Sequence, residues 1–234
     1  RKAALTLLID IGTNGEMVLG DRHRRVACST AAGPAFEGAK ISCGMRGAPG
    51  AVDHVTLKNG QLSYTVIGGG EPKGLCGSGL LDLVAALLNL GIIDESGRME
   101  EKTFRLCENV TLTQKDVREV QLAKAAIRAG IELLCAHLGS KPEDIQTVLL
   151  AGAFGSYMNP ASACRIGMIP PVLLDRIQSI GNAAGEGAKL CAVNAAAYEY
   201  SKKLAAETEF LELASKPEFQ DCFVDALEFC EEED

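Results

Sequence analysis

Several common signatures of cofactor and partner binding are missing from this 234-residue chain. Its nine cysteines include no C-x-x-C pair and its three histidines are scattered, so the clustered spacing that zinc or an iron–sulfur cluster requires is lacking. A net charge of -8 argues against nucleic acid or an anionic membrane surface as a partner. These features favour a reduced protein with buried thiols, and we expect it in the cytoplasm.

Long hydrophobic segments and internal repeats are also missing. The longest apolar segment, residues 75–93, contains Asp82, Asn89 and several glycines, which is typical of a buried helix rather than a membrane span. The chain begins Arg1-Lys2-Ala3, without an initiator methionine or a signal-peptide pattern, and enters an apolar run at once. We therefore expect residues 1–234 to be a single domain that is a fragment of a longer protein.

The most informative feature that is present is the segment LTLLIDIGTNGEMVLG, residues 5–20, which predicts a buried strand, a tight turn and a returning strand. Its two turn glycines are expected to supply the freedom to reverse. Such a turn exposes backbone N–H groups, the Thr13 hydroxyl and the Asn14 amide to an anion, while Asp10 suits a divalent cation or its waters. The alternative is a structural hairpin with Asn14-Gly15 at its tip, which this segment alone favours.

The rest of the chain alternates strand and helix patterns. Strands are predicted at 4–9, 16–19, 25–29, 52–58, 61–67, 145–150, 177–180 and 210–213, and helices at 80–90, 113–138, from about 160, 181–200 and 216–229. Residues 231–234 are expected to form a solvated acidic tail. This interleaving predicts an α/β fold whose ligand edge collects the turns after Ile9 and Leu150.

Two small-residue turns and one basic pair are further candidates for ligand binding. GLCGSG, residues 74–79, opens an apolar helix as either an anion site or a means of close packing, and we favour packing. Ala151-Gly152-Ala153-Phe154-Gly155 follows a buried strand, as the first turn does. Lys124 and Arg128 lie four residues apart on the longest helix, where they are either solvated or line a phosphate or base pocket.

Five motifs in one order resemble the ATP-binding C-terminal part of the reductive activators of corrinoid proteins: LLIDIGTNGE (7–16), STAAGPAFEGA (29–39), GLCGSGLLDLV (74–84), QLAKAAIRAG (121–130) and LAGAFGSYMNP (150–160). Those proteins belong to the superfamily of acetate and sugar kinases, heat-shock ATPases and actin (ASKHA), in which two ribonuclease-H-like lobes clamp ATP. The resemblance implies the second lobe, a mixed central sheet flanked by helices. The family's ferredoxin domain with its 2Fe-2S cluster, and its first lobe, match nothing in this chain.

The resemblance also implies roles for individual residues. Those expected to face the terminal phosphates and Mg²⁺ lie in the first turn, with Asp10 holding the ion through water: Asp10, Gly12, Thr13 and Asn14. Those expected beside the adenosine lie after the later strand and on the long helix: Gly152, Ala153, Gly155, Lys124 and Arg128.

The function implied for the intact protein is ATP-dependent electron transfer that returns an inactive Co(II) corrinoid protein of a methyltransferase system to Co(I), in anaerobic one-carbon metabolism. Asp10 and Glu37 are the candidate catalytic residues. Two alternatives stay open: a small-molecule kinase of the same superfamily, with Glu37 as general base, and a non-catalytic dimerisation or docking domain. A homodimer is one possible assembly, and the isolated lobe is expected to bind ATP weakly or not measurably.

Overall fold

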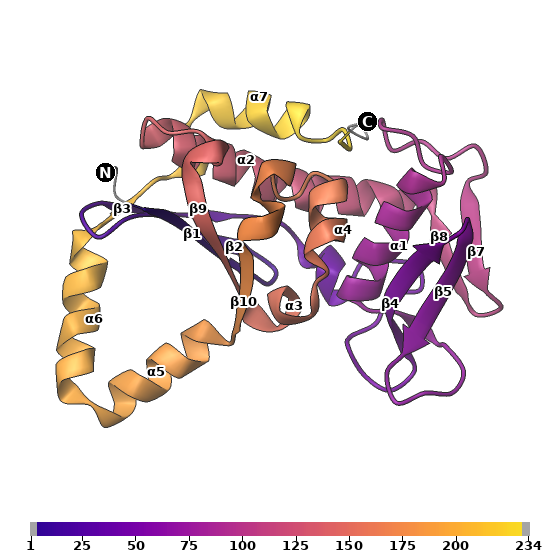
Figure 1. The fold of residues 1–234 in the computed structure, drawn as a ribbon, viewed down its shortest axis with the longest axis horizontal. Coiled ribbons are helices and arrows are strands. Elements are labelled where there is room, and N and C mark those ends of the chain that lie inside the picture. The colour runs from indigo at the N-terminus through magenta and orange to yellow at the C-terminus, as the bar shows by residue number, and fades with distance from the viewer. Residues whose placement is uncertain (1–3, 231–234) are drawn as a thin grey trace.

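A mixed six-stranded sheet forms the centre of the molecule, in a computed structural model that describes residues 4–230 (Figure 1). From one edge to the other its strands are β10 (Ile177–Gly181), β9 (Ile145–Ala151), β1 (Leu5–Ile11), β2 (Gly15–Gly20), β3 (Arg25–Thr30) and β11 (Thr208–Phe210). The strands β1, β2 and β3 form an antiparallel meander, whereas β9 and β10 run parallel to β1. This mixed sheet, with helices packed on it, confirms the predicted α/β class.

One long helix covers one face of the sheet. This helix, α2 (Gln114–His137), begins after Thr113, which forms the predicted capping box with Asp116. Alternate residues of β1 and β2 are buried on this side, and a Cβ on Gly130 of α2 would overlap the Met17 side chain of β2. A shorter helix, α7 (Pro217–Asp225), packs on α2 in turn (Figure 1). A large part of the core therefore lies between the sheet and α2.

A smaller unit is inserted between β3 and α2. It contains the short helix η1 (Pro34–Glu37), the longer helix α1 (Gly77–Asn89) and a sheet of β5 (Gln61–Val66), β4 (Ala51–Lys58) and β6 (Gly74–Leu75). Asn59 and Gly60 have φ angles of 52° and 75°, which confirms the hairpin turn predicted between β4 and β5. A further hairpin, β7 (Thr103–Cys107) and β8 (Val110–Thr113), was not predicted from the sequence.

The turn between β1 and β2 differs from the predicted one. Three residues join the strands, and none of Gly12, Asn14 and Gly15 has a positive φ. The expectation that the two turn glycines supply the conformational freedom for the reversal is therefore wrong. Gly15 lacks a side chain for a packing reason instead, because a Cβ there would lie 3.2 Å from Thr30 Cγ2 and 3.4 Å from Ile127 Cγ1.

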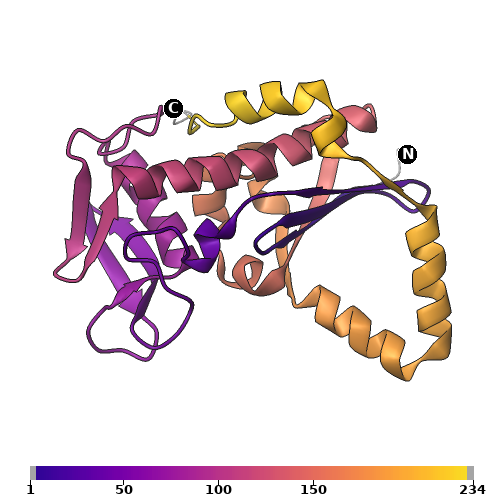
Figure 2. The same cartoon turned by 180° about the vertical axis from the view of Figure 1, so that it is seen from behind.

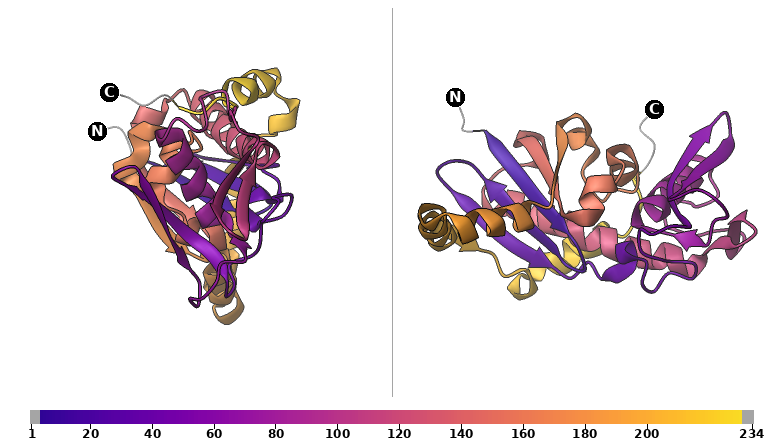
Figure 3. Two further views of the ribbon diagram at one scale, coloured as in Figure 1. Left: turned by 90° about the vertical axis from the view of Figure 1, so that its right-hand side faces the viewer. Right: turned by 90° about the horizontal axis from the view of Figure 1, so that it is seen from below.

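Beyond β10 the chain leaves the body as two helices, α5 (Ala183–Val193) and α6 (Ala195–Glu207), here called the arm (residues 183–207). Figures 1 and 2 show the arm hanging from the two edges of the sheet on the side away from α2, and Figure 3 shows it at the opposite end of the molecule from the inserted unit. Neither helix buries a residue. The prediction of one closely packed helix over 181–200 is therefore wrong: Asn194 interrupts it and caps α6.

The remaining elements are short. The helices α3 (Gly152–Tyr157) and α4 (Pro160–Arg165) follow β9, and three 3-10 turns lie at η2 (Pro142–Asp144), η3 (Pro171–Arg176) and η4 (Leu213–Ser215). The last helix, α7, is shorter than predicted, and the acidic tail at 231–234 lies outside the described residues. Over residues 4–230, no helix has the length and hydropathy of a membrane span. All nine cysteines are free, and four are buried: Cys28, Cys76, Cys135 and Cys164.

Candidate functional site

Two strand ends meet at one edge of the central sheet. The strands β1 and β9 are parallel neighbours with Asp10 opposite Ala151, so the turn after each strand emerges at the same carboxyl edge. Gly152 follows with a φ of 84°, and a Cβ there would lie closer than 3.0 Å to Asp10 Oδ1. The prediction that both turns share one edge is confirmed. Gly152 lacks a side chain because the Asp10 carboxylate occupies that space.

The Asp10 carboxylate is held in an unfavourable setting for a negative charge. It is partly buried and faces Glu16 across the β1–β2 pair. Burial first, and then the nearby Glu16, raise the pKa of Asp10. Within residues 4–230, no group donates a hydrogen bond to this carboxylate. A cation at this edge would relieve that charge, and carboxylate oxygens are the ligands that Mg²⁺ prefers.

Protein side chains alone do not complete a metal site in this region. In the described part of the chain, no group of three or more His, Cys, Asp or Glu residues is arranged to hold a metal ion. Mg²⁺ typically binds proteins through one or two carboxylates and takes its other ligands from water and substrate phosphates. Asp10 at an exposed sheet edge fits that mode of binding.

The tip of the β1–β2 turn docks on η1. The Thr13 hydroxyl donates a hydrogen bond to Glu37 Oε1 at 2.8 Å, and the Gly33 N–H donates to the Thr13 carbonyl at 2.8 Å. Thr13, Asn14 and Glu37 are all exposed. The structure therefore brings the predicted phosphate residues and the candidate base Glu37 together, and it engages the Glu37 carboxylate with a hydroxyl.

A cavity of about 940 Å³ opens beside this cluster, between η1, β4, the start of α1 and α3. Its lining includes Glu37 together with Ala153 and Phe154 from α3, the helix that begins where the sequence predicted a turn after β9. The rings of Phe36 and Phe154 stack with centroids 4.7 Å apart, which joins the inserted unit to α3. The volume lies in the range of small-molecule and cofactor sites.

The glycine turn before α1 serves packing. A Cβ on Gly77 would overlap the Phe36 carbonyl, and one on Gly79 would overlap the Val52 carbonyl. The favoured interpretation of GLCGSG is therefore confirmed, although Gly77 also lines the cavity. Gly155 is buried in α3, where a Cβ would lie 3.5 Å from the Cβ of Leu150, an ordinary contact.

Lys124 and Arg128 do not join this cluster. Lys124 is buried, its ammonium group donates to the Glu228 carbonyl, and it lies 5.1 Å from the centre of the Phe229 ring. Burial lowers the pKa of Lys124 to about 8. Arg128 Nε donates to Glu132 Oε1 at 2.8 Å on the same helix. Neither residue lines the cavity, and their nucleotide roles stay predictions.

The cavity also includes a residue that no motif indicated. His54 of β4 lines it, with Nδ1 3.0 Å from Oδ2 of the buried Asp82. In the sequence, Asp82 is a charged residue within the apolar run of α1. This is the one feature of the sequence that could have indicated a buried polar contact such as the one between Asp82 and His54.

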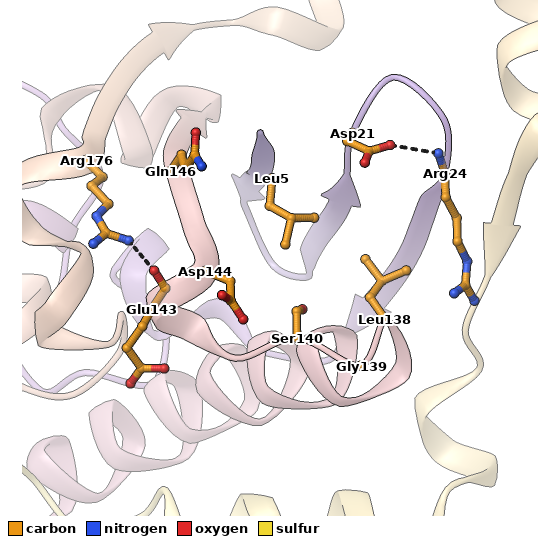
Figure 4. Close-up of a pocket in the computed structure, with 10 residues that line it drawn as sticks. All are labelled: Leu5, Asp21, Arg24, Leu138, Gly139, Ser140, Glu143, Asp144, Gln146 and Arg176. Carbon is orange, nitrogen blue, oxygen red and sulfur yellow. Dashed lines mark hydrogen bonds between the residues drawn. The ribbon is translucent and has the colours of Figure 1, made fainter. Parts of the chain in front are cut away.

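A second hollow, of about 690 Å³, lies at the other end of the strands (Figure 4). Leu5 and Gln146 line it from the starts of β1 and β9, so it is remote from the edge that carries Asp10. Its two cations have structural partners: Arg24 pairs with Glu209 at 3.0 Å, and Arg176 donates to the Glu143 carbonyl at 2.7 Å. The carboxyl edge therefore remains the candidate site.

The fold is that of a ribonuclease-H-like lobe of the ASKHA type. Three features define it: the order of strands in the central sheet, the unit inserted between β3 and α2, and the cluster of Asp10, Thr13, Glu37 and Gly152 at the carboxyl edge. The model of the family described as the C-terminal domain of RACo, the ASKHA domain, matches residues 4–234, and the chain belongs to this family. This membership implies nucleotide binding, and it confirms the resemblance and the fold predicted from the motifs.

The relatives agree with this family. The corrinoid activation enzyme RamQ of Eubacterium limosum is 36% identical over 252 residues, which cover 96% of this chain and 42% of that protein. The [Co(II) methylated amine-specific corrinoid protein] reductase of Methanosarcina barkeri is 32% identical over 70% of this chain and 35% of its own. A solved reductive activator for corrinoid, iron-sulfur protein superimposes with a TM-score of 0.87 at 36% identity, over 97% of this chain and 40% of its own. The chain thus spans about two fifths of the length of these proteins.

Proposed function

We propose that this chain is the ATP-binding lobe of a reductive activator that returns a Co(II) corrinoid protein to Co(I). The observation that carries the proposal is the meeting of Asp10 and Gly152 at one sheet edge, beside the Thr13–Glu37 pair and the 940 Å³ cavity. The relatives, all named for corrinoid activation or reduction, support the same activity.

In this proposal the lobe holds the nucleotide at two places. Asp10, Thr13 and Asn14 face the terminal phosphates, and Ala153 and Phe154 border the nucleoside in the cavity. Mg²⁺ bound with the nucleotide supplies charge neutralisation for the phosphates. Asp10 would hold the ion through water, by accepting hydrogen bonds from the water molecules that the ion coordinates. Because phosphoryl chemistry depends on positioning and electrostatics, these residues act by holding and orienting groups rather than by covalent attack.

The lobe would couple nucleotide binding to the conformation of a larger activator. Reduction of Co(II) to Co(I) consumes one electron at low potential, and we propose that a 2Fe-2S cluster outside this chain delivers it. Residues 1–234 then form one domain, which supplies one side of a two-lobed nucleotide clamp. Closure around ATP favours one arrangement of the activator on its corrinoid protein. We propose that this partner belongs to a methyltransferase system and that both proteins act in the cytoplasm.

The arm suggests a homodimer as the assembly. Its helices leave Leu190 and Tyr198 half exposed or more, and isolated helices of this length are marginal in water without packing. The arm contains three Glu and three Lys residues, so its net charge is zero although the whole chain carries -8. Two arms can therefore pack together without electrostatic repulsion between them. We propose that a second copy packs on the arm. Light scattering should show a dimer that Leu190→Glu with Tyr198→Glu dissociates while the charge control Lys189→Glu does not. A wild-type monomer, or a dimer that survives the double variant, contradicts this.

The experiment for the activator function uses a protein of the relatives' length that carries this lobe. We expect Mg²⁺-dependent ATP hydrolysis that rises when a Co(II) corrinoid protein is added, together with appearance of the Co(I) absorbance. A phosphorylated small-molecule product would establish the kinase alternative instead. Absence of any nucleotide binding would establish a docking domain.

A further inference from the structure

A buried carboxylate fixes the ring of His54 at the cavity wall. Asp82 is 2% exposed, and its Oδ2 lies 3.0 Å from His54 Nδ1. Because a carboxylate only accepts hydrogen bonds, Nδ1 carries the proton of this contact. In the neutral ring the lone pair then lies on Nε2. Within residues 4–230, Nε2 has no hydrogen-bond partner, and the His54 side chain is 43% exposed.

Asp82 does not depend on His54 alone. Its Oδ1 accepts from the Ser162 hydroxyl at 2.6 Å, and its Oδ2 also accepts from the Val55 backbone N–H at 3.3 Å. Ser162 lies on α4, Val55 on β4 and Asp82 on α1. The carboxylate on α1 is thus held by donors from two other elements, α4 and β4, which gives the ring of His54 a rigid support.

The charge of the cavity selects the part of a nucleotide that fits beside His54. Glu37 and Asp53 line the cavity and Asp82 stands behind His54, against the single lining cation Arg46. This excess of carboxylates disfavours phosphate groups. Aromatic and small residues, with Phe154 and Tyr157 among them, complete the lining. A neutral, partly aromatic ligand group that carries hydrogen-bond donors matches this surface.

We propose that His54 accepts, at Nε2, a hydrogen bond from the nucleoside part of the bound nucleotide, and that Asp82 is the positioning residue for the ring. This inference rests on the nucleotide function proposed above. Two donors of the nucleoside share the required chemistry: the ribose hydroxyls and the exocyclic amine of adenine. Both are neutral and both suit a lone pair on a fixed imidazole.

Two substitutions at His54 separate this role from a purely structural one. The amide of asparagine reaches the position of Nδ1, so His54→Asn keeps the donor to Asp82 and removes Nε2. The amide of glutamine reaches the position of Nε2, so His54→Gln keeps an acceptor for the ligand and removes the Asp82 contact. Ligand recognition predicts weaker binding in His54→Asn than in His54→Gln. If His54 is only structural, His54→Gln should be less stable than His54→Asn, because it loses the contact with Asp82. The two variants should then bind the nucleotide equally well.

The measurement is a titration of the labelled 234-residue chain with Mg·ATP by NMR, which detects weak binding. With three histidines in the sequence, the ring signals are assigned by substitution, and His23→Asn, in an exposed turn, is the matched control. We expect saturable shifts of the His54 ring signals, and a dissociation constant raised roughly five- to tenfold in His54→Asn, as for loss of one hydrogen bond. The control should bind as wild type does.

Three analogues identify the donor. If a ribose hydroxyl is recognised, 2′-deoxy-ATP or 3′-deoxy-ATP should bind wild type more weakly than ATP does, whereas His54→Asn should bind that analogue and ATP equally well. If the amine is recognised, inosine triphosphate should show that pattern. Shifts at the Gly12, Thr13 and Gly152 amides without any at His54 would overturn this inference and leave nucleotide binding standing. Absence of shifts at every position, both in this chain and in a protein of the relatives' length that carries it, would overturn both.

Discussion

Replacing Gly152 by alanine is expected to cost more stability than the same change at a neighbouring strand end. Gly152 has a φ of 84°, and its added Cβ would also overlap the Asp10 carboxylate. Gly181, at the end of β10, has a φ of 69° with nothing within 4 Å of the added Cβ. Gly181→Ala therefore carries only the left-handed backbone penalty, whereas Gly152→Ala carries that penalty and a collision.

The backbone penalty and the collision with the Asp10 carboxylate are expected to cost similar amounts of stability. A left-handed L residue costs roughly 1–2 kcal/mol, so this is the expected loss in Gly181→Ala. Overpacking costs roughly 1–3 kcal/mol more, so Gly152→Ala should lose about 2–5 kcal/mol. Combining it with Asp10→Ala removes the colliding oxygen, although the Ile11 carbonyl remains 3.1 Å from the Cβ. We therefore expect a favourable coupling of about 1 kcal/mol in the double-mutant cycle.

Urea unfolding of the four variants and the wild type, followed by circular dichroism, measures these differences. Equal losses in Gly152→Ala and Gly181→Ala would refute the contact between the two strand ends. So would a double-mutant cycle without coupling. Because the collision displaces Asp10, Gly152→Ala should also weaken Mg·ATP binding in a protein of the relatives' length, and Gly181→Ala should not.

Three further results are expected. Asp10→Asn should stabilise the chain at neutral pH, because the raised pKa of Asp10 penalises its charged form; the gain should vanish as pH falls below the unfolded-state pKa, and a gain independent of pH in urea unfolding would contradict this. For Lys124, whose pKa is lowered to about 8, wild-type stability should rise as pH increases from 8 toward 10.5, and Lys124→Met should abolish that rise; an equal rise in both proteins contradicts it. Calorimetry of the isolated chain should show weak or no Mg·ATP binding and its visible spectrum no cluster band, whereas tight binding would mean that one lobe holds a complete site.

The parts of the fold that were predictable depend on local patterns. Apolar runs located β1 and β9, and since parallel neighbours end at one edge, the meeting of Asp10 with the turn after Leu150 followed. Thr113 with Asp116 marked the start of α2, and Asn59-Gly60 marked a hairpin. The residues that form each of these local signals lie within a few positions of one another.

The parts that were missed depend on partners far away in the sequence. His54 and Asp82 lie 28 residues apart on different elements, and no spacing rule joins them. Lys124 reads as a surface cation, but the segment around Phe229 covers it. The small residues of the arm predict a helix that can pack closely against another element. They do not indicate whether that element belongs to the same chain or to another one.

The central claim is that the β1–β2 turn of this lobe holds the phosphates of Mg·ATP. The most direct measurement is corrinoid-stimulated ATP hydrolysis by a protein of the relatives' length that carries Asp10→Ala, with Asp175→Ala, an exposed carboxylate in η3, as the control. We predict that Asp10→Ala abolishes turnover with the fold intact by circular dichroism, and that Asp175→Ala hydrolyses ATP as wild type does. Unchanged hydrolysis in Asp10→Ala would reduce this turn to a structural hairpin and contradict the claim.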